Sequence, residues 1–305
     1  MSTSGVPGRR PSSLERDERW ARVAWAFLAE PRETSVVAAL GTFGAVEALA
    51  RFRAGHLLVR PGALERLPLL DVDDLAHAAD RQGVHVVVPG DEGWPLGVDR
   101  LDEPPYALFV RGYPDLDTLV ERSVAVVGSR AATDYGMRTA ADLAEGLGAR
   151  GFTIISGAAY GIDSAAHRAA LASGGPTVAV LACGADRFYP AAHRSMLNEI
   201  ARTGAVVSEV PVGAAPYRSR FLARNRLIAT LARATIVVEA SQRSGSLTTA
   251  RHARENHLPV GAVPGPVTSM ASAGCHALIR DAEACSSPMR PRSPSSQGVS
   301  VKMSC

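Results

Sequence analysis

The sequence predicts an α/β fold, an extended Rossmann-like, mostly parallel sheet with helices on both faces, preceded by a small helical N-terminal domain. Two observations predict it. From Ser123 onward, short apolar runs rich in β-branched residues alternate with longer helical stretches, as in a parallel sheet joined by helical crossovers. Between Trp20 and about Arg81 the apolar residues instead follow a helical spacing.

The N-terminal region is predicted to be an arm followed by short helices. Residues 1–14 are rich in Ser, Gly, Pro and Arg and should be disordered, because they have little apolar surface to bury. Val23, Phe27 and Leu28 are spaced for one apolar helical face. Residues 41–44 contain two glycines and should break the helical region, which resumes at residues 45–52. Helices around such a turn resemble a helix-hairpin-helix or sterile-alpha-motif bundle.

The strands and helices of the sheet domain follow from the alternation of apolar runs. A short strand is expected first, at residues 85–88. Six further strands are expected at residues 124–127, 152–155, 177–181, 205–207, 235–238 and 259–263. Five helices are expected between them, at residues 135–149, 162–172, 191–201, 221–232 and 247–255.

Composition divides the chain into four parts. After the arm, residues 15–110 form the helical domain and its linker, and residues 111–284 form the Rossmann-like domain. Residues 285–305 are mostly Ser, Pro, Arg and Gly, so we expect a disordered tail and no winged-helix domain.

Charge is distributed unevenly along a chain whose net charge is only +3. Residues 63–104 contain ten acidic residues against three arginines. Residues 218–254 contain eight arginines and one acidic residue, Glu239. Such asymmetry indicates a polyanion-binding face opposite an acidic one, with single-stranded nucleic acid as the expected anion.

Cysteine usage and hydropathy exclude several classes of protein. The four cysteines are scattered without a Cys-x-x-Cys pair, so neither a metal site nor a disulfide framework is expected, and a reducing cytoplasm fits. No signal peptide is evident, and no run reaches the roughly 18 apolar residues that cross a bilayer. We therefore expect a cytoplasmic protein with no membrane partner.

Three small-residue loops follow predicted strands and open helices. They are Gly128-Ser129-Arg130, the segment that runs from Ser156-Gly157 to Asp163, and Ser244-Gly245-Ser246. Ligands of open α/β sheets bind beyond the carboxyl ends of the strands. Glycine permits close backbone approach there, and free amides at a helix N-terminus hold phosphate. The loops lack the Gly-x-Gly-x-x-Gly fingerprint, so no dinucleotide cofactor is expected.

Two arginines of residues 221–232 should have different roles. Arg224 and Arg226 lie about 200° apart on a helical wheel, so both cannot face one groove. We expect one to contact phosphate and the other to pair internally with Glu239. Asp163 can cap its helix or act at the ligand site, and His167 lies on the same helical face. Tyr189 or Phe188 can stack a base or pack in the core.

Taken in order, these motifs resemble the DNA-processing protein A family (DprA, also called Smf). The resemblance covers roughly residues 20–281, and its many ordered motifs make it far more specific than a lone glycine loop. The segments that carry it are Val126-Val127-Gly128-Ser129-Arg130, residues 156–163 with His167, Tyr189-Pro190, Ser208-Glu209, residues 221–228, Val238-Glu239-Ala240, residues 244–247, Pro264-Gly265 and Gly274-Cys275-His276, with residues 91–95 and 104–109 upstream.

The resemblance implies a homodimeric, single-stranded DNA-binding protein. Such proteins help load a RecA-type recombinase onto incoming DNA during uptake and recombination, and they relieve inhibition by single-strand-binding protein. They are not known as enzymes, so no catalytic residue, metal or cofactor is expected. The residues expected to contact DNA are Gly128, Ser129, Arg130, Ser156, Gly157, Tyr160, Arg194, Arg224, Ser244, Gly245 and Ser246.

The chain departs from the family pattern at three places. Position 160 is Tyr where an arginine is frequent, so a phosphate contact is absent there or replaced by stacking. Ala191-Ala192 follows Pro190 where a basic residue is frequent, and Arg194 can compensate. The winged-helix domain of many members has no counterpart in the tail.

An enzymatic alternative is a nucleotide phosphoribohydrolase of the lysine-decarboxylase-like type. Such proteins share this kind of sheet and carry a glycine-rich loop near a catalytic glutamate, and Glu239 beside Ser244-Gly245 invites the comparison. The Pro-Gly-Gly-x-Gly-Thr-x-x-Glu pattern is absent, which disfavours it. A third alternative, a scaffold for partner proteins, predicts no salt-dependent DNA binding.

Overall fold

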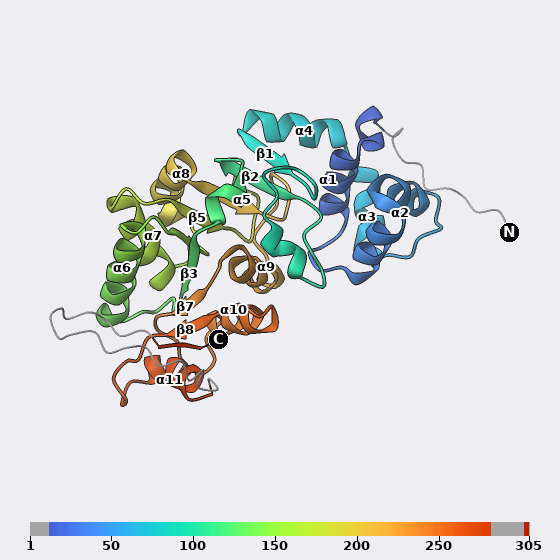
Figure 1. Cartoon of the computed structure of the whole chain (residues 1–305). Coiled ribbons are helices and arrows are strands. Elements are labelled where there is room, and N and C mark those ends of the chain that lie inside the picture. Colours follow the sequence, from blue (N-terminus) through green and yellow to red (C-terminus); the bar gives the residue numbers. More distant parts are fainter. Residues whose placement is uncertain (1–11, 282–301, 305) are drawn as a thin grey trace.

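The computed structural model describes residues 12–281 and 302–304, and its strands form one nine-stranded sheet in the order β1-β2-β6-β5-β4-β3-β7-β8-β9 (Figure 1). The strands are β1 (Val84–Val87), β2 (Leu108–Gly112), β3 (Ser123–Val127), β4 (Thr153–Ser156), β5 (Thr177–Val180), β6 (Ala205–Ser208), β7 (Thr235–Val237), β8 (Val260–Ala262) and β9 (Lys302–Ser304).

The parallel part of the sheet consists of β6, β5, β4, β3, β7 and β8. These are the six strands predicted from residue 123 onward, which confirms the fold class. Antiparallel strands flank them: β1 and β2 at one edge and β9 at the other. Strand β2 was not predicted. It pairs with β6 and so carries the sheet into the predicted linker.

Helices cover both faces of the parallel strands. They are α5 (Leu116–Val120), α6 (Asp134–Gly148), α7 (Ile162–Ala172), α8 (Arg194–Thr203), α9 (Arg218–Leu231), α10 (Ser246–Glu255) and α11 (Ala273–Arg280). In β3, Val124 and Val126 share a core with residues of α6 and α7, whereas Ala125 and Val127 share a core with residues of α9 and α10. Alternate residues therefore enter opposite layers, as a buried strand requires.

The N-terminal helices are α1 (Glu18–Leu28), α2 (Thr34–Arg53), α3 (Pro61–Arg66) and α4 (Val72–Arg81). Asp17 caps α1 by accepting from the amides of Arg19 and Trp20. The predicted break at residues 41–44 is confined to Gly44, whose φ of 75° is favourable only for glycine. At this kink Trp25 of α1 donates its indole N–H to the carbonyl of Ala45 at 3.2 Å.

Helix α2 is long and apolar enough to cross a membrane by length and composition, which the sequence analysis did not anticipate. Its apolar residues serve the core instead. Val36, Leu49 and Phe52 are buried, and the Phe52 ring lies 5.4 Å from that of Trp25. Together with the kink at Gly44, these contacts identify α2 as a core helix of the helical domain.

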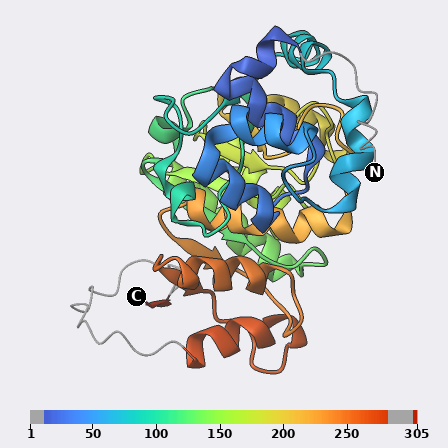
Figure 2. The same cartoon turned by 90° about the vertical axis from the view of Figure 1, so that its right-hand side faces the viewer.

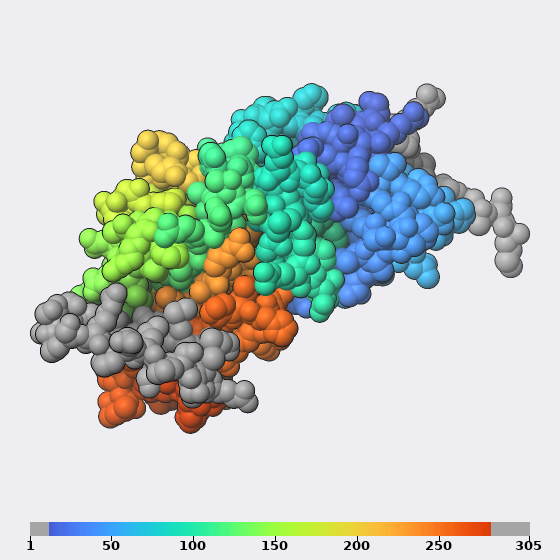
Figure 3. Space-filling view, in the orientation of Figure 1, coloured from blue at the N-terminus to red at the C-terminus, as the bar shows by residue number. Residues whose placement is uncertain are grey.

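The helical domain packs over the sheet without a gap. One apolar core includes Trp25 of α1, Phe109 of β2, Val206 of β6 and Leu197 of α8. In the turned view the blue helices overlie the sheet, and the space-filling view shows their atoms against the cyan-to-teal segments around β1 (Figures 2 and 3). The boundary predicted between residues 110 and 111 consequently falls inside β2.

The predictions for the two termini lie mostly outside the described residues. Residues 12–14 of the predicted arm are ordered, however, because Ser12 donates its hydroxyl to Asp73 at 2.9 Å and accepts from the amide of Leu14. Residues 302–304 of the predicted tail form β9 beside β8, so the expectation of disorder is wrong there. β-pairing at a sheet edge needs only backbone groups, which composition does not reveal.

Candidate functional site

The predicted loops after β3 and β7 meet in one pocket at the carboxyl edge of the parallel strands. The pocket has a volume of about 320 Å³ and lies between these loops, the loop after β4 and helices α9 and α10. Gly128, Ser129 and Arg130 line it, and so do Ser244, Gly245 and Ser246. The two loops therefore meet at the edge where ligands of open α/β sheets bind.

The loop after β3 is held against two neighbours. A Cβ at Gly128 would lie 2.5 Å from a side-chain carbon of Ile162 and 2.9 Å from the carbonyl of Glu239, so only glycine fits. The amide of Ser129 donates to that same carbonyl at 2.7 Å, and its own carbonyl accepts from the amide of Ile162. The backbone that lines the pocket is consequently fixed by β7 and α7.

Arg130 extends from this fixed loop into solvent. Its guanidinium carbon lies 5.2 Å from the ring centroid of Phe221 on α9, which is cation–π geometry. The Phe221 ring in turn lies 5.7 Å from that of Tyr189, which is half exposed. Among the described residues, no carboxylate forms an ion pair with Arg130. Its charge is therefore available to an anion in the pocket.

The loop after β7 forms the opposite wall and opens α10. Ser244 and Ser246 have their hydroxyl oxygens 2.7 Å apart, and Asn225 of α9 donates to the carbonyl of Gly245 at 3.3 Å. Nothing lies within 4 Å of a Cβ built on Gly245, so the space in front of this turn is open. The hydroxyls of this turn and the positive end of the dipole of α10 border the same pocket as Arg130, which suits an oxyanion.

The loop after β4 supports the pocket from behind, contrary to part of the prediction. Ser156 is fully buried and donates to the carbonyl of Val126 at 2.6 Å. Gly157 is buried against Arg224. Neither residue lines the pocket, because Ser156 turns toward β3 and the guanidinium of Arg224 lies against Gly157. Their predicted contact with a ligand is replaced by a structural role.

Asp163 stabilises the loop after β4 and also borders the pocket. Its carboxylate accepts from the amides of Gly157 and Ala159 at 3.2 and 3.3 Å. The predicted capping of its own helix is wrong, because α7 has no side-chain cap and Asp163 bonds the loop that precedes it. These bonds stabilise the loop although Ala158 has a φ of 55°, which is strained for a residue with a Cβ. Burial raises the pKa of Asp163, and the nearby charge of Arg224 opposes that shift.

Arg224 lies on the floor of the pocket and is almost completely buried. One of its terminal nitrogens donates to the carbonyls of Gly157 and Val180. Burial lowers the pKa of Arg224 to about 10, which leaves the guanidinium charged near neutral pH. A buried positive charge beneath an open pocket increases the attraction for an anion above it.

Arg226 forms an internal ion pair, but its partner is Glu209 and not the predicted Glu239. Arg226 donates to Glu209, which follows β6, and both side chains are buried. Glu239 instead accepts from the amide and hydroxyl of Thr133 at 2.8 and 2.9 Å, so it caps α6. As their positions on the helical wheel predicted, Arg224 and Arg226 point to different sides of α9. The wheel does not show which strand end Arg226 faces.

The remaining predicted residues lie outside the pocket lining. Tyr160 is half exposed, with its ring edge-on to His193 at 4.8 Å between centroids. Arg194 is exposed at the start of α8. His167 is buried and bonds Thr177 rather than Asp163, so the possible pair of that histidine and Asp163 is not formed.

Sequence reasoning missed several residues that line the pocket. Asn225 stands between the two arginines of α9, and its position in the Arg-Asn-Arg motif was the available signal. The others were unmarked small or apolar positions, because only the fold turns them inward. The missed residues are Val127, Ala131, Ala159, Phe221, Leu222, Asn225, Ile228, Ser241 and Thr249.

Exposed arginines lie at the carboxyl edge of the parallel strands. The segments that follow β3, β5, β6 and β7 expose five arginines. Asp134 after β3 is an exposed carboxylate, whereas three carboxylates in the segments after β4, β6 and β7 are buried and already hydrogen-bonded. The exposed arginines are Arg130, Arg187, Arg194, Arg218 and Arg243, and the buried acids are Asp163, Glu209 and Glu239. This edge of the sheet is therefore suited to a polyanion.

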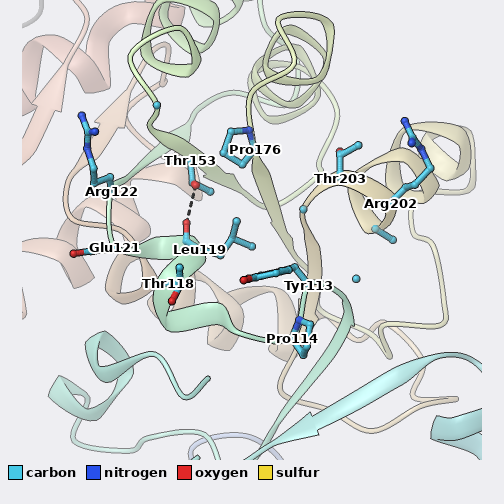
Figure 4. Close-up of a pocket in the computed structure, with 14 residues that line it drawn as sticks. Tyr113, Pro114, Thr118, Leu119, Glu121, Arg122, Thr153, Pro176, Arg202 and Thr203 are labelled. Atoms are coloured by element: carbon cyan, nitrogen blue, oxygen red, sulfur yellow. Dashed lines mark hydrogen bonds between the residues drawn. The ribbon is translucent and has the colours of Figure 1, made fainter. Parts of the chain in front are cut away.

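A larger pocket of about 710 Å³ lies at the amino edge of the same strands. Tyr113, Leu119 and Pro176 line it, with Arg122 and Arg202 at its sides (Figure 4). Arg202 is paired with Glu199, and Arg122 lies over the ring of Phe152. None of the predicted site residues lies there, so size alone does not identify the functional site.

In residues 12–281, no three His, Cys, Asp or Glu side chains are grouped to hold a metal ion. The phosphoribohydrolase alternative required an available Glu239, but its carboxylate is buried and hydrogen-bonded to Thr133 and does not line the pocket.

Fold and pocket together define a class: a Rossmann-like α/β protein with an arginine- and serine-lined pocket at the carboxyl edge of its sheet. The chain belongs to the DNA recombination-mediator protein A family, DprA, whose family model matches residues 85–289. A putative DNA processing protein DprA of Mycobacterium tuberculosis is 47% identical over 275 residues, which cover 84% of this chain and 70% of the relative.

Two solved structures of DNA processing protein A are similar to this one. The Streptococcus pneumoniae protein is 33% identical with a TM-score of 0.73, over 86% of this chain and 92% of that chain. The Helicobacter pylori protein is 30% identical with a TM-score of 0.58, over 65% of this chain and 89% of that chain. The latter structure is described in terms of a single-stranded DNA binding mode. These similarities confirm the predicted family and fold.

Proposed function

We propose that this chain binds single-stranded DNA at the carboxyl edge of its sheet as a recombination mediator, without catalysing a reaction. The observation that carries the proposal is the pocket itself. Arg130 and the turn at residues 244–246 face each other across about 320 Å³, with no carboxylate of the described residues paired to Arg130. A phosphate of the DNA backbone fits between a guanidinium and a serine-rich turn at the positive end of a helix dipole.

The surroundings of the pocket favour a single strand over a duplex. Tyr160 and Tyr189 expose about half of their side chains at this edge. Bases of a flexible single strand can stack on such rings, whereas bases of a duplex are already stacked and paired. We infer that Tyr160 and Arg194, which follow β4 and β5, contact the strand on that side of the pocket, and that Arg224 acts on it from below.

The proposed binding depends mainly on phosphates. Its affinity should therefore fall steeply as salt rises and depend little on base sequence. Membership of the DprA family supports three further proposals: that the bound strand is handed to a RecA-type recombinase, that the protein acts as a homodimer, and that it works in the cytoplasm on incoming DNA. The family names describe DNA processing and recombination mediation rather than an enzyme.

A gel-shift titration with single-stranded and double-stranded oligonucleotides of equal length, at two salt concentrations, tests the proposal. We expect tighter binding of the single strand, and weaker binding of it at the higher salt concentration. Equal binding of both forms, or affinity that ignores salt, would contradict it. Incubation with nucleoside monophosphates is the companion assay, in which released base would indicate the phosphoribohydrolase instead.

A further inference from the structure

The carboxylate of Glu30 links the helical domain to the first turn of α9. Glu30 lies two residues beyond the end of α1, and its two oxygens accept from Arg220 of α9 at 2.8 and 2.9 Å. Arg66 at the end of α3 donates to the same carboxylate at 2.7 Å. One acidic side chain therefore holds two arginines, one from its own domain and one from a helix that lines the candidate site.

The position of Glu30 is itself fixed. The hydroxyl of Tyr106 lies 3.2 Å from the carbonyl of Glu30 and accepts from the amide of Glu33 at 3.3 Å. Arg66 also donates to the carbonyl of Leu28 at 3.2 Å. Burial disfavours the charged form of Glu30, but Arg220 and Arg66 outweigh it and lower the pKa of this carboxyl. Glu30 is therefore an ionised and well-ordered anchor.

Arg220 carries this constraint to the pocket. Its remaining terminal nitrogen donates to the carbonyl of Ala215 at 2.8 Å, and its guanidinium lies 4.9 Å from the ring centroid of Tyr217. These contacts close the start of α9, which has no side-chain cap. The next residue is Phe221, which lines the pocket beneath the guanidinium of Arg130.

We propose that Glu30 is a positioning residue for the DNA pocket. It holds Arg220, and through Arg220 it sets the place of Phe221 and thus of Arg130. The helical domain would then contribute to DNA affinity without touching DNA, because a guanidinium already in place loses less freedom on binding. This inference rests on the proposed function of the pocket.

A double-mutant cycle tests this coupling, with anisotropy of a labelled oligothymidine as the measurement. Glu30→Gln keeps the size of the side chain and removes its charge, and we expect it to weaken binding about five-fold. In an Arg130→Ala background the same change should weaken binding by less than about two-fold, because the residue it positions is gone. Equal effects in both backgrounds, or no effect of Glu30→Gln, would overturn the inference alone. If Arg130→Ala leaves affinity unchanged, the proposed pocket fails as well.

Arg53→Gln is the matched control for a general loss of stability. It removes the arginine that pairs with Glu15 in the same helical domain and leaves the contacts of Glu30 with Arg220 and Arg66 in place. We expect a lower thermal unfolding midpoint than that of the wild type, with DNA affinity within about two-fold of the wild type. If Arg53→Gln weakens DNA binding as much as Glu30→Gln does, the effect belongs to the stability of the helical domain and the positioning role is wrong.

Discussion

The guanidinium of Arg130 lies over the ring of Phe221, with 5.2 Å between the guanidinium carbon and the ring centroid. The two residues come from different elements, the loop after β3 and the first turn of α9, and both line the pocket at the carboxyl edge of the sheet. The ring restricts a long, exposed side chain that would otherwise be mobile. This contact connects the helix packing of the fold to the charge that the pocket presents.

Phe221→Leu should weaken single-stranded DNA binding by about three- to ten-fold, because leucine keeps apolar bulk but removes the aromatic face that holds Arg130. The measurement is anisotropy with an oligothymidine at low salt. Phe152→Leu is the matched control, since Arg122 lies over Phe152 in the same way at the opposite edge of the sheet. Affinity should be unchanged in that variant. Equal losses in both variants would show that the effect is not local to the pocket.

Gly128→Ala should destabilise the protein by about 1–3 kcal/mol, because the added methyl group meets the carbonyl of Glu239 and the side chain of Ile162. Gly245→Ala is the comparison. That position has a φ of −62° and open space around its Cβ, so stability should change by less than about 0.5 kcal/mol. Urea denaturation measures both. Similar values for the two variants would contradict the packing described for the loop after β3.

Glu209→Ala should destabilise the fold by about 3–5 kcal/mol, because it leaves the charge of Arg226 buried without its partner. The Nε and one terminal nitrogen of Arg226 already have no partner among the described residues. Glu103→Ala removes the partner of Arg32, which is 43% exposed, and should change stability by less than about 1 kcal/mol. The measurement is the free energy of unfolding in urea. A small loss of stability in Glu209→Ala would show that water or another acceptor pairs with Arg226 in that variant.

His167 should make the fold sensitive to acid. Burial, and then the charge of His193, lower the pKa of His167 to about 3. The folded protein therefore keeps this ring neutral, whereas the unfolded chain protonates it near its ordinary pKa of about 6.5. Stability from this group is complete above that pH and is lost as pH falls toward 3, by about 1.4 kcal/mol per unit.

The measurement is the free energy of unfolding at pH 7 and pH 5 for the wild type and for His167→Gln. Groups that the two proteins share, including Asp163 with its raised pKa, cancel in the comparison. We expect the wild type to lose roughly 2 kcal/mol more than the variant over this interval. Equal losses would mean that His167 is protonated in the folded state at pH 5, contrary to its buried position.

The parallel strands were predictable because each is a local, β-branched run that ends at a small-residue loop. β2 was not, because it follows Pro104-Pro105 and owes its place to a pairing of Phe109 with Ser208 that no local pattern encodes. The kink in α2 at Gly44 likewise depends on a contact with α1, because the amide of Ala45 donates to the carboxylate of Glu18. The local sequence does not show this contact. The sequence therefore indicated the sheet but not its antiparallel edge.

For the candidate site, the loops could be predicted from the sequence, but the directions of the side chains could not. A strand end followed by Gly-Ser-Arg or Ser-Gly-Ser indicates a phosphate loop, and both of these loops line the pocket. Side-chain direction was not encoded locally. Ser156 turns into the sheet, and Glu209 rather than Glu239 faces Arg226, because strand order and the rotation of α9 decide which groups meet. The hydrogen-bond and ion-pair partners of these side chains could therefore be identified only in the complete structure.

The most direct test of the pocket is the salt dependence of oligothymidine affinity for the wild type and for Arg130→Ala, with thermal unfolding as the check that both proteins are folded. If Arg130 contacts a phosphate, the variant should bind more weakly, and its plot of log affinity against log salt should be shallower by about 0.7, the value of one contact to a single strand. An Arg130→Ala protein with the affinity and salt slope of the wild type would contradict the assignment of this pocket to DNA.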